Sequence, residues 1–74
     1  MNQNIYYVVR KTDDGELEYL GTISSYARNS FYENRNLALE FDNKEAAQAV
    51  ADWMYRNGDY NVNVAKMTYT ITVL

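Results

Sequence analysis

The chain contains no histidine, no cysteine and no proline among its 74 residues. Without histidine and cysteine, we expect no zinc site, no thiolate nucleophile, no disulfide and no imidazole base acting near neutral pH. Eight tyrosines, in contrast, supply large apolar rings with a polar tip, a side-chain type that is enriched where one molecule binds another. The composition therefore indicates a recognition protein that carries no metal or cofactor.

The length predicts a single domain over residues 1–74, and a hydrophobic content of 47% is typical of a globular fold. A net charge of −3 argues against binding to duplex DNA or to an anionic membrane, both of which favour a basic surface. No apolar run approaches the roughly 18 residues that a membrane-spanning helix needs. The first residues lack the pattern of a signal peptide, so we expect a cytoplasmic protein.

The first half of the chain predicts a β-hairpin. Ile5–Lys11 and Leu17–Ile23 are rich in β-branched and aromatic residues, and the turn pair Asp14-Gly15 lies between them. A two-residue loop would pair Val9 with Leu20. A three-residue loop, with the turn glycine in the left-handed region, pairs Val9 with Tyr19 and Arg10 with Glu18. The longer loop is favoured because it gathers one apolar face, made of Ile5, Tyr7, Val9, Leu17, Tyr19 and Ile23.

The segment Ser24–Asn36 has no clear period, and part of it can form a helical turn or an extra edge strand. Long irregular segments in compact domains are often functional. This one interleaves aromatic and cationic side chains, and its candidate binding residues are Tyr26, Arg28, Phe31, Tyr32 and Arg35.

The next elements are a strand and a helix. Leu37–Phe41 alternates as a third strand, and Asp42 is placed to cap a helix that runs to about Asn57, where Gly58 ends it. Trp53 is expected to anchor the core. The expected inward stripe of this helix consists of Ala46, Val50, Trp53 and Asn57, widened by Ala49 and Met54.

The last segment, Asn61–Leu74, alternates as a strand but changes phase at Ala65-Lys66, where we expect a bulge or bend. The predicted fold is therefore α+β: a twisted antiparallel sheet of four or five strands with one helix on one face, in the order β-β-β-α-β.

If the odd-numbered side of the hairpin faces the helix, then Tyr6, Val8 and Leu20 form an apolar patch on the open side. Such a patch typically marks an interaction site. A homodimer, formed through that face or through the edge of the last strand, would also cover it.

Catalysis is not expected, because a domain of this size has little room for a cleft and its acidic cluster, Asp13 to Glu18, lies on a solvated hairpin tip. Single-stranded nucleic acid is the alternative ligand, since aromatic platforms and cations alternate at Tyr26, Arg28, Tyr32 and Arg35. The acidic total makes nucleic acid the less favoured partner.

Two stretches carry a family resemblance: IYYVVRKTDDGELEYLG at the hairpin and LEFDNKEAAQAVADW at the strand-to-helix junction. They resemble small accessory proteins of phages and prophages of Gram-positive bacteria, and the junction is similar to that of some anti-CRISPR proteins. The resemblance implies a protein that binds and inhibits or redirects a host protein, such as a nuclease complex, in the bacterial cytoplasm. A structural subunit of a phage assembly is a further reading.

Overall fold

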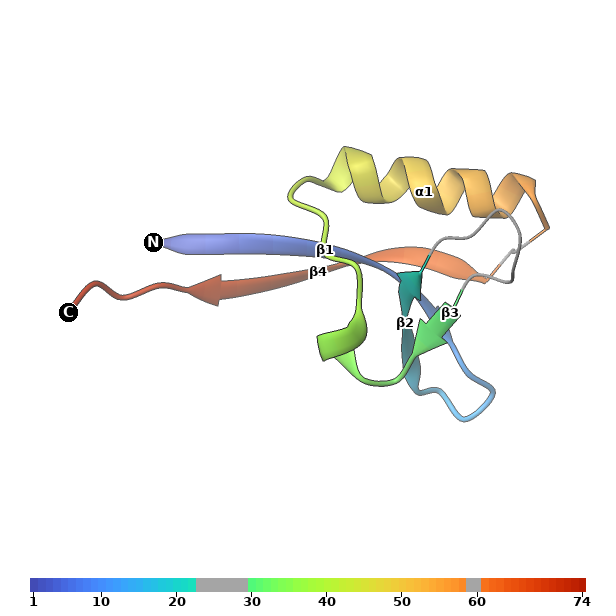
Figure 1. Ribbon diagram of the computed structural model, residues 1–74, viewed down its shortest axis with the longest axis horizontal. Helices are drawn as coiled ribbons and strands as arrows, with labels where there is room; N and C mark the ends of the chain where they lie inside the picture. The colour runs from blue at the N-terminus through green and yellow to red at the C-terminus, as the bar shows by residue number, and fades with distance from the viewer. Residues whose placement is uncertain (23–29, 59–60) are drawn as a thin grey trace.

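The computed structural model describes residues 1–22, 30–58 and 61–74. Within these ranges the chain forms a four-stranded antiparallel sheet, in the order β3-β2-β1-β4, and one α-helix. Figure 1 shows the helix running along one side of the two long strands. The predicted α+β class and the order of elements along the chain are confirmed. The elements are β1 (Asn2–Lys11), β2 (Leu17–Thr22), β3 (Ser30–Tyr32), the 3-10 helix η1 (Arg35–Leu37), α1 (Lys44–Arg56) and β4 (Val62–Thr70).

The β1–β2 hairpin has the register of the three-residue loop. Val9 pairs with Tyr19 and Arg10 with Glu18, and Gly15 has a φ of 84°. That left-handed backbone favours glycine, which lacks a Cβ atom. The Arg10 Nε donates to the Glu18 carboxylate at 2.9 Å, so the cross-strand ion pair fixes the same register as the turn.

The third strand is β3, whereas the sequence predicted it at Leu37–Phe41. That segment instead contacts each of two strands through one residue. The Leu39 N–H donates to the Leu20 carbonyl in β2, and Phe41 exchanges two hydrogen bonds with Tyr6 in β1, all at 2.9 Å. It bridges β2 and β1 without joining the regular ladder. The edge strand and helical turn expected within residues 24–36 are β3 and the start of η1.

The helix α1 begins one residue later than predicted. The Asn43 side chain, and not that of Asp42, accepts a hydrogen bond from the Ala46 N–H at 2.8 Å. This bond satisfies one of the free N–H groups at the helix start. Gly58, with a φ of 99°, follows the last turn as predicted.

The main core lies between α1 and the even-numbered face of the hairpin. Val8 and Leu20 are 0% and 1% exposed. The helix contributes the buried stripe Ala47, Ala51 and Met54. The expectation that Trp53 anchors this core is wrong, because its side chain remains 40% exposed. The inward stripe is thus displaced by one position from the predicted one.

The opposite, odd-numbered face is also covered in the middle of the sheet. Tyr7 and Val9 are only 4% and 5% exposed. A Cβ atom at Gly21 would lie 2.5 Å from a ring carbon of Tyr32 and 2.7 Å from the Leu37 carbonyl oxygen, so the chain around η1 packs against β2 on this side. The expectation that this face lies beneath the helix and the other stays open is therefore wrong. The expected pairing partner of Ile5, Ile23, lies outside the described residues.

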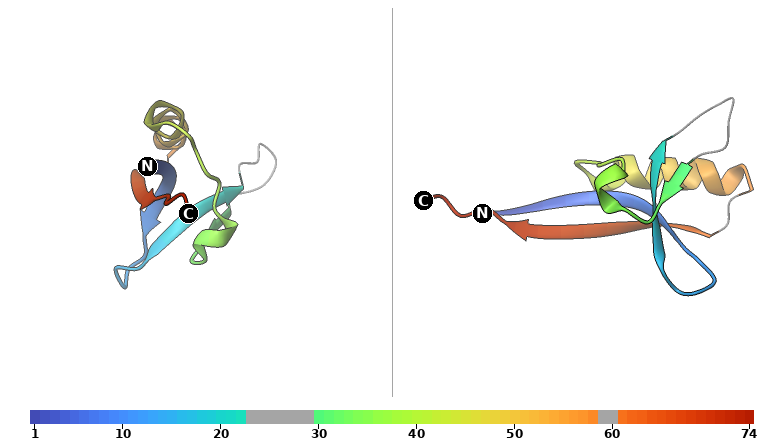
Figure 2. Two further views of the ribbon diagram at one scale, coloured as in Figure 1. Left: turned by 90° about the vertical axis from the view of Figure 1, so that its left-hand side faces the viewer. Right: turned by 60° about the horizontal axis from the view of Figure 1, so that its bottom comes forward.

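The bulge expected at Ala65-Lys66 is absent. β4 pairs with β1 without interruption, from Val62 opposite Arg10 to Thr70 opposite Asn2. The apolar phase changes because α1 covers only the first part of β4. The paired ends of the two strands, residues 1–5 and 67–74, project beyond the helix, and we call them the arm. Figures 1 and 2 show this arm extending from the body, with both chain ends at its tip.

Candidate protein-binding surface

The predicted apolar patch is not a surface. Val8 and Leu20 are buried against α1, and Tyr6 is half-buried and packs against the same core. The physical reason is that the helix lies on the even-numbered face, so these three residues stabilise the fold. They do not form an exposed apolar patch that a partner could contact.

The predicted aromatic and cationic residues of the middle segment occupy several places. Tyr26 and Arg28 lie outside the described residues. Phe31 and Tyr32 are half-buried in β3, and Arg35 is exposed at the start of η1. The structure therefore does not gather the described members into one continuous platform.

Phe31 has a cationic neighbour that sequence reasoning did not identify. The Arg10 guanidinium lies 4.0 Å from the centre of the Phe31 ring, and its Nε also donates to Glu18. A guanidinium over an aromatic face is attracted by the ring electrons. Because this cation is held between a ring and a carboxylate, it is already engaged in structure and is not free to neutralise a phosphate.

One side of α1, beside its buried stripe, carries apolar residues that are only partly buried. Four residues at the spacing i, i+3, i+4 and i+7 lie beside the buried stripe, and they form what we call the Trp53 strip: Ala46, Ala49, Val50 and Trp53. Ala46 and Val50 are half-buried, Ala49 is exposed, and Trp53 is 40% exposed. An amphipathic helix normally buries one such stripe. Here a second apolar stripe remains accessible.

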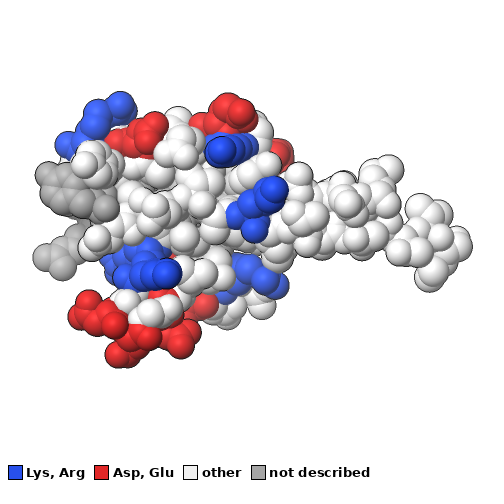
Figure 3. All heavy atoms as spheres, turned by 180° about the vertical axis from the view of Figure 1, so that it is seen from behind, with Lys and Arg blue, Asp and Glu red and all other residues white. Residues whose placement is uncertain are grey.

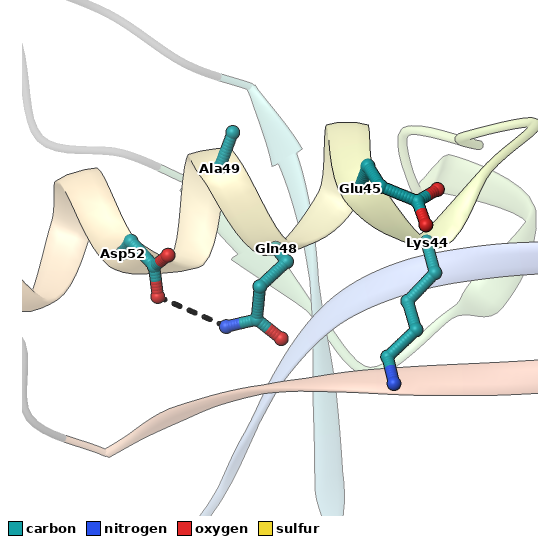
Figure 4. Close-up of a pocket in the computed structure, with 5 residues that line it drawn as sticks. All are labelled: Lys44, Glu45, Gln48, Ala49 and Asp52. Atoms are coloured by element: carbon teal, nitrogen blue, oxygen red, sulfur yellow. Dashed lines mark hydrogen bonds between the residues drawn. The ribbon is translucent and has the colours of Figure 1, made fainter.

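Another side of α1 carries polar side chains (Figure 4). The Gln48 amide donates to the Asp52 carboxylate at 2.9 Å, one turn along α1. Figure 4 shows these two side chains and Lys44 on one side of the helix, with Ala49 pointing away from them. An open hollow of about 350 Å³ is bounded by these residues and Glu45. Because this hollow lies open along one flank of the helix, it lacks the enclosing walls of a small-molecule site.

A smaller hollow of about 180 Å³ lies where the start of α1 meets the sheet, and its lining includes Tyr6, Val64 and two lysines, Lys44 and Lys66. In the part of the chain that the structure describes, neither lysine forms an ion pair. Figure 3 shows basic side chains near the middle of this face and a group of acidic ones at the hairpin end. The hollow can thus attract a carboxylate carried by a partner.

The buried phenol of Tyr7 is the described group with a distinctive protonation behaviour. Burial raises the pKa of Tyr7 above its ordinary value of 10.0, the nearby Glu40 carboxylate raises it further, and Arg35 opposes both. The phenol therefore stays protonated at neutral pH. Its surroundings give it no accessible cleft, since the side chain is 4% exposed.

The described residues contain no cluster of three or more acidic side chains placed to hold a metal ion. Over the same residues, no helix combines the length and the apolar character needed to cross a lipid bilayer. No protein family, curated protein or solved structure matched this chain.

Sequence reasoning missed the Trp53 strip because it assigned tryptophan to the core. A signal was present: apolar residues occupy a wider arc of α1 than one sheet face can cover. The sequence alone gives no rule for choosing which part of that arc is buried.

Proposed function

We propose that this chain acts by binding another protein, without catalysis, and that the Trp53 strip is its contact surface. The observation that carries the proposal is the 40% exposure of Trp53 beside a stripe of α1 that is already buried. Leaving a tryptophan partly in water forgoes much of the stabilisation that its burial would give. Tryptophan is also the residue type most enriched among those that dominate binding energy in interfaces.

The spacing of the strip indicates how the partner would be shaped. Anchors at i, i+3, i+4 and i+7 are the pattern of an amphipathic helix that lies in an apolar groove. Lys44, Gln48 and Asp52 point to a different side of α1 from Ala49 (Figure 4) and would lie outside that contact. The partner is therefore a protein with an apolar groove.

The resemblance to phage accessory proteins makes a protein of a Gram-positive bacterial host the expected partner, in the cytoplasm, with inhibition or redirection of that protein as the outcome. A nuclease complex is the first candidate class, through the similarity to anti-CRISPR proteins. Of the predicted contact residues, Arg35 remains accessible, but it lies in η1 on the odd-numbered side of the sheet, away from α1.

The test is capture from the lysate of a Gram-positive host, followed by titration of the purified partner. We expect the wild-type protein and a Leu17→Ala control to bind equally, because Leu17 is 38% exposed but lies on the hairpin, away from α1. Trp53→Ala should fold and weaken binding by about tenfold or more, as truncation of a central anchor does.

Equal binding by Trp53→Ala and the control would contradict the strip as the contact surface. A labelled single-stranded oligonucleotide provides the second arm. Binding that weakens steeply as salt is raised would overturn the proposal in favour of nucleic acid. Absence of an oligonucleotide complex at low salt would support it.

A further inference from the structure

The arm is a two-stranded ribbon with an open edge. β4 is the last strand of the sheet, so its outer side has no partner within the described residues. At the arm, the side of β1 that faces away from β4 is also unpaired within the described residues, because β2 meets β1 only from Val9 onward. Two strands alone are marginally stable in water, and a third strand or a packed face is normally needed.

The arm lacks the features that usually protect such an edge. Natural edge strands carry charged residues, proline or a bulge that prevents pairing with another chain. Residues 67–74 contain no charged residue and no proline, and the pairing of β4 with β1 runs without a bulge. Figure 3 shows the arm free of acidic and basic side chains along its visible length.

The pairing of β4 with β1 determines which backbone groups of β4 face the open edge. Met1 and Ile71 exchange two backbone hydrogen bonds, of 3.1 and 2.7 Å, so the odd-numbered residues of β4 bond to β1. In an antiparallel ladder the alternate residues point the other way. The N–H and C=O groups of Thr68, Thr70 and Thr72 therefore face the open side.

The two faces of the arm are chemically distinct. On one face, Thr68 and Thr70 donate to Asn4 and Asn2 at 2.8 and 3.0 Å, so the polar groups bond to each other across the ribbon. The other face carries the apolar side chains Ile5, Met67, Ile71 and Val73, together with Tyr69, whose hydroxyl donates to the Gln3 side chain on the same face at 3.2 Å.

We infer that the open edge of the arm pairs with the same edge of a second copy of this chain, antiparallel and about a two-fold axis near Thr70. A two-fold axis sets each strand against its own copy, with residue Thr68 opposite Thr72 of the other protomer. Two residues that lie opposite each other point to the same face of the sheet. Threonine side chains therefore lie beside threonine side chains, and apolar side chains lie beside apolar ones. The apolar pairs are Met67 with Val73 and Tyr69 with Ile71.

The distribution of charge favours a second copy of this chain as the partner, and it favours the register centred on Thr70. Symmetric pairing brings like charges together wherever a charged residue lies close to the axis, which destabilises the pair. The uncharged run 67–74 avoids this, and with the axis at Thr70 the nearest charged residue, Lys66, faces Leu74 and not its own copy. An uncharged edge also offers nothing to steer a differently charged partner.

The size of the contact sets the expected strength. One short strand per protomer buries less than the roughly 1,600 Å² of a standard interface, so we expect a reversible dimer with a micromolar dissociation constant. This association is independent of the Trp53 strip, which lies on α1 in the body. Trp53→Ala should therefore dimerise like the wild type even where it loses its partner.

Sedimentation velocity over about 1 to 200 µM, a range that spans micromolar dissociation constants, tests the pairing. We expect a concentration-dependent shift toward twice the 8.6 kDa mass of one protomer. A chain that stays monomeric throughout, or one that forms species larger than a dimer, would overturn the inference.

Charge substitutions at the facing positions test the register. Thr68→Lys with Thr72→Lys places like charges opposite each other twice, and the same holds for Thr68→Glu with Thr72→Glu. Each variant alone should dimerise roughly tenfold more weakly than the wild type. An equimolar mixture of the two should recover dimers, which also shows that both variants are folded.

The matched control adds the same charge elsewhere on the same strand. Asn61→Lys with Asn63→Lys changes two exposed residues, one directly before the body end of β4 and one in it, and neither has a partner in the proposed register. This control should dimerise like the wild type. Equal weakening by the control, or a mixture of Lys and Glu variants that stays monomeric, would show that the arm does not pair in this way.

Discussion

Individual residues on the odd-numbered face show how the sheet is closed on the side away from α1. The Tyr7 ring meets the Tyr19 ring edge to face, with centroids 5.4 Å apart and planes at 77°. Aromatic pairs favour this geometry because the positive ring edge meets the negative ring face. This pair, with Val9 beside it, forms a second buried layer that the sequence pattern did not distinguish from the first.

Alkaline pH tests the burial of Tyr7. The folded chain raises the pKa of its phenol above the ordinary 10.0, chiefly by burial. Its contribution to stability is therefore fully present below pH 10 and is lost as the pH rises from 10 through the raised folded-state pKa. Urea unfolding at about pH 9 and 11 should show a larger fall for the wild type than for Tyr7→Phe. Equal falls would show that the phenol titrates as freely in the folded chain as in the unfolded one.

Gly21 tests the packing of η1 and β3 against β2. An added Cβ atom would lie 2.7 Å from the Leu37 carbonyl oxygen, and backbone cannot move aside as readily as a flexible side chain. We expect Gly21→Ala to lower the free energy of unfolding by about 1–3 kcal/mol, the usual cost of overpacking. Chemical denaturation measures this. An unchanged unfolding midpoint would mean that the chain around η1 does not rest on β2 as described.

The elements differ in how far the sequence determines them. The hairpin register was predictable because two local signals agree: a turn glycine, Gly15, and the facing charges of Arg10 and Glu18. The choice of face was not, because both faces of β1 are apolar in the middle and each is covered by a different distant segment. Periodicity shows that a face is buried, but not what buries it.

The helix illustrates the same limit. The predicted and observed stripes both follow the spacing of an amphipathic helix, and the residue they share is Met54. The preference of large aromatic residues for the interior selected the wrong one, since small alanines let α1 lie close to the sheet while Trp53 stays at the margin. The candidate surface could not be identified from sequence because it depends on how α1 is rotated about its own axis, and the observed rotation differs from the predicted one by about one residue position.

The helix start offers a direct comparison of two adjacent capping residues. Asn43 accepts the Ala46 N–H at 2.8 Å, whereas Asp42 has no such role. We expect Asn43→Ala to cost about 1 kcal/mol of unfolding free energy and Asp42→Ala to stay within about 0.5 kcal/mol of the wild type. Denaturant midpoints of the two variants give the comparison. The opposite ranking would move the cap back to the position that the sequence pattern favoured.

At the scale of the whole molecule, the chain consists of a body closed on both faces and an arm that is not. The overall extents of 46 × 27 × 19 Å reflect that projection. Within the described residues, the buried side chains belong to the body, while the arm contributes polar cross-strand bonds and exposed apolar residues. Stability should therefore be unequal along a single strand, β4, that belongs to both parts.

Hydrogen exchange of two amides of β4 measures this difference. Ala65 pairs with Tyr7 in the body and Tyr69 pairs with Gln3 in the arm, and both amides point toward β1 by the alternation of the ladder. At low protein concentration, the Tyr69 amide should exchange at least about tenfold faster, because the arm can open without exposing the core.

Denaturant and concentration separate the causes of that difference. Exchange at Ala65 should accelerate with added urea, as global unfolding does, whereas exchange at Tyr69 should barely respond. Raising the protein concentration should then slow Tyr69 and newly protect the outward amide of Thr70, since a second arm would replace water as the acceptor of its hydrogen bond. Equal protection of Ala65 and Tyr69 at every concentration, with the same urea dependence, would mean that body and arm unfold as one unit and that the ribbon needs no partner strand to be stable.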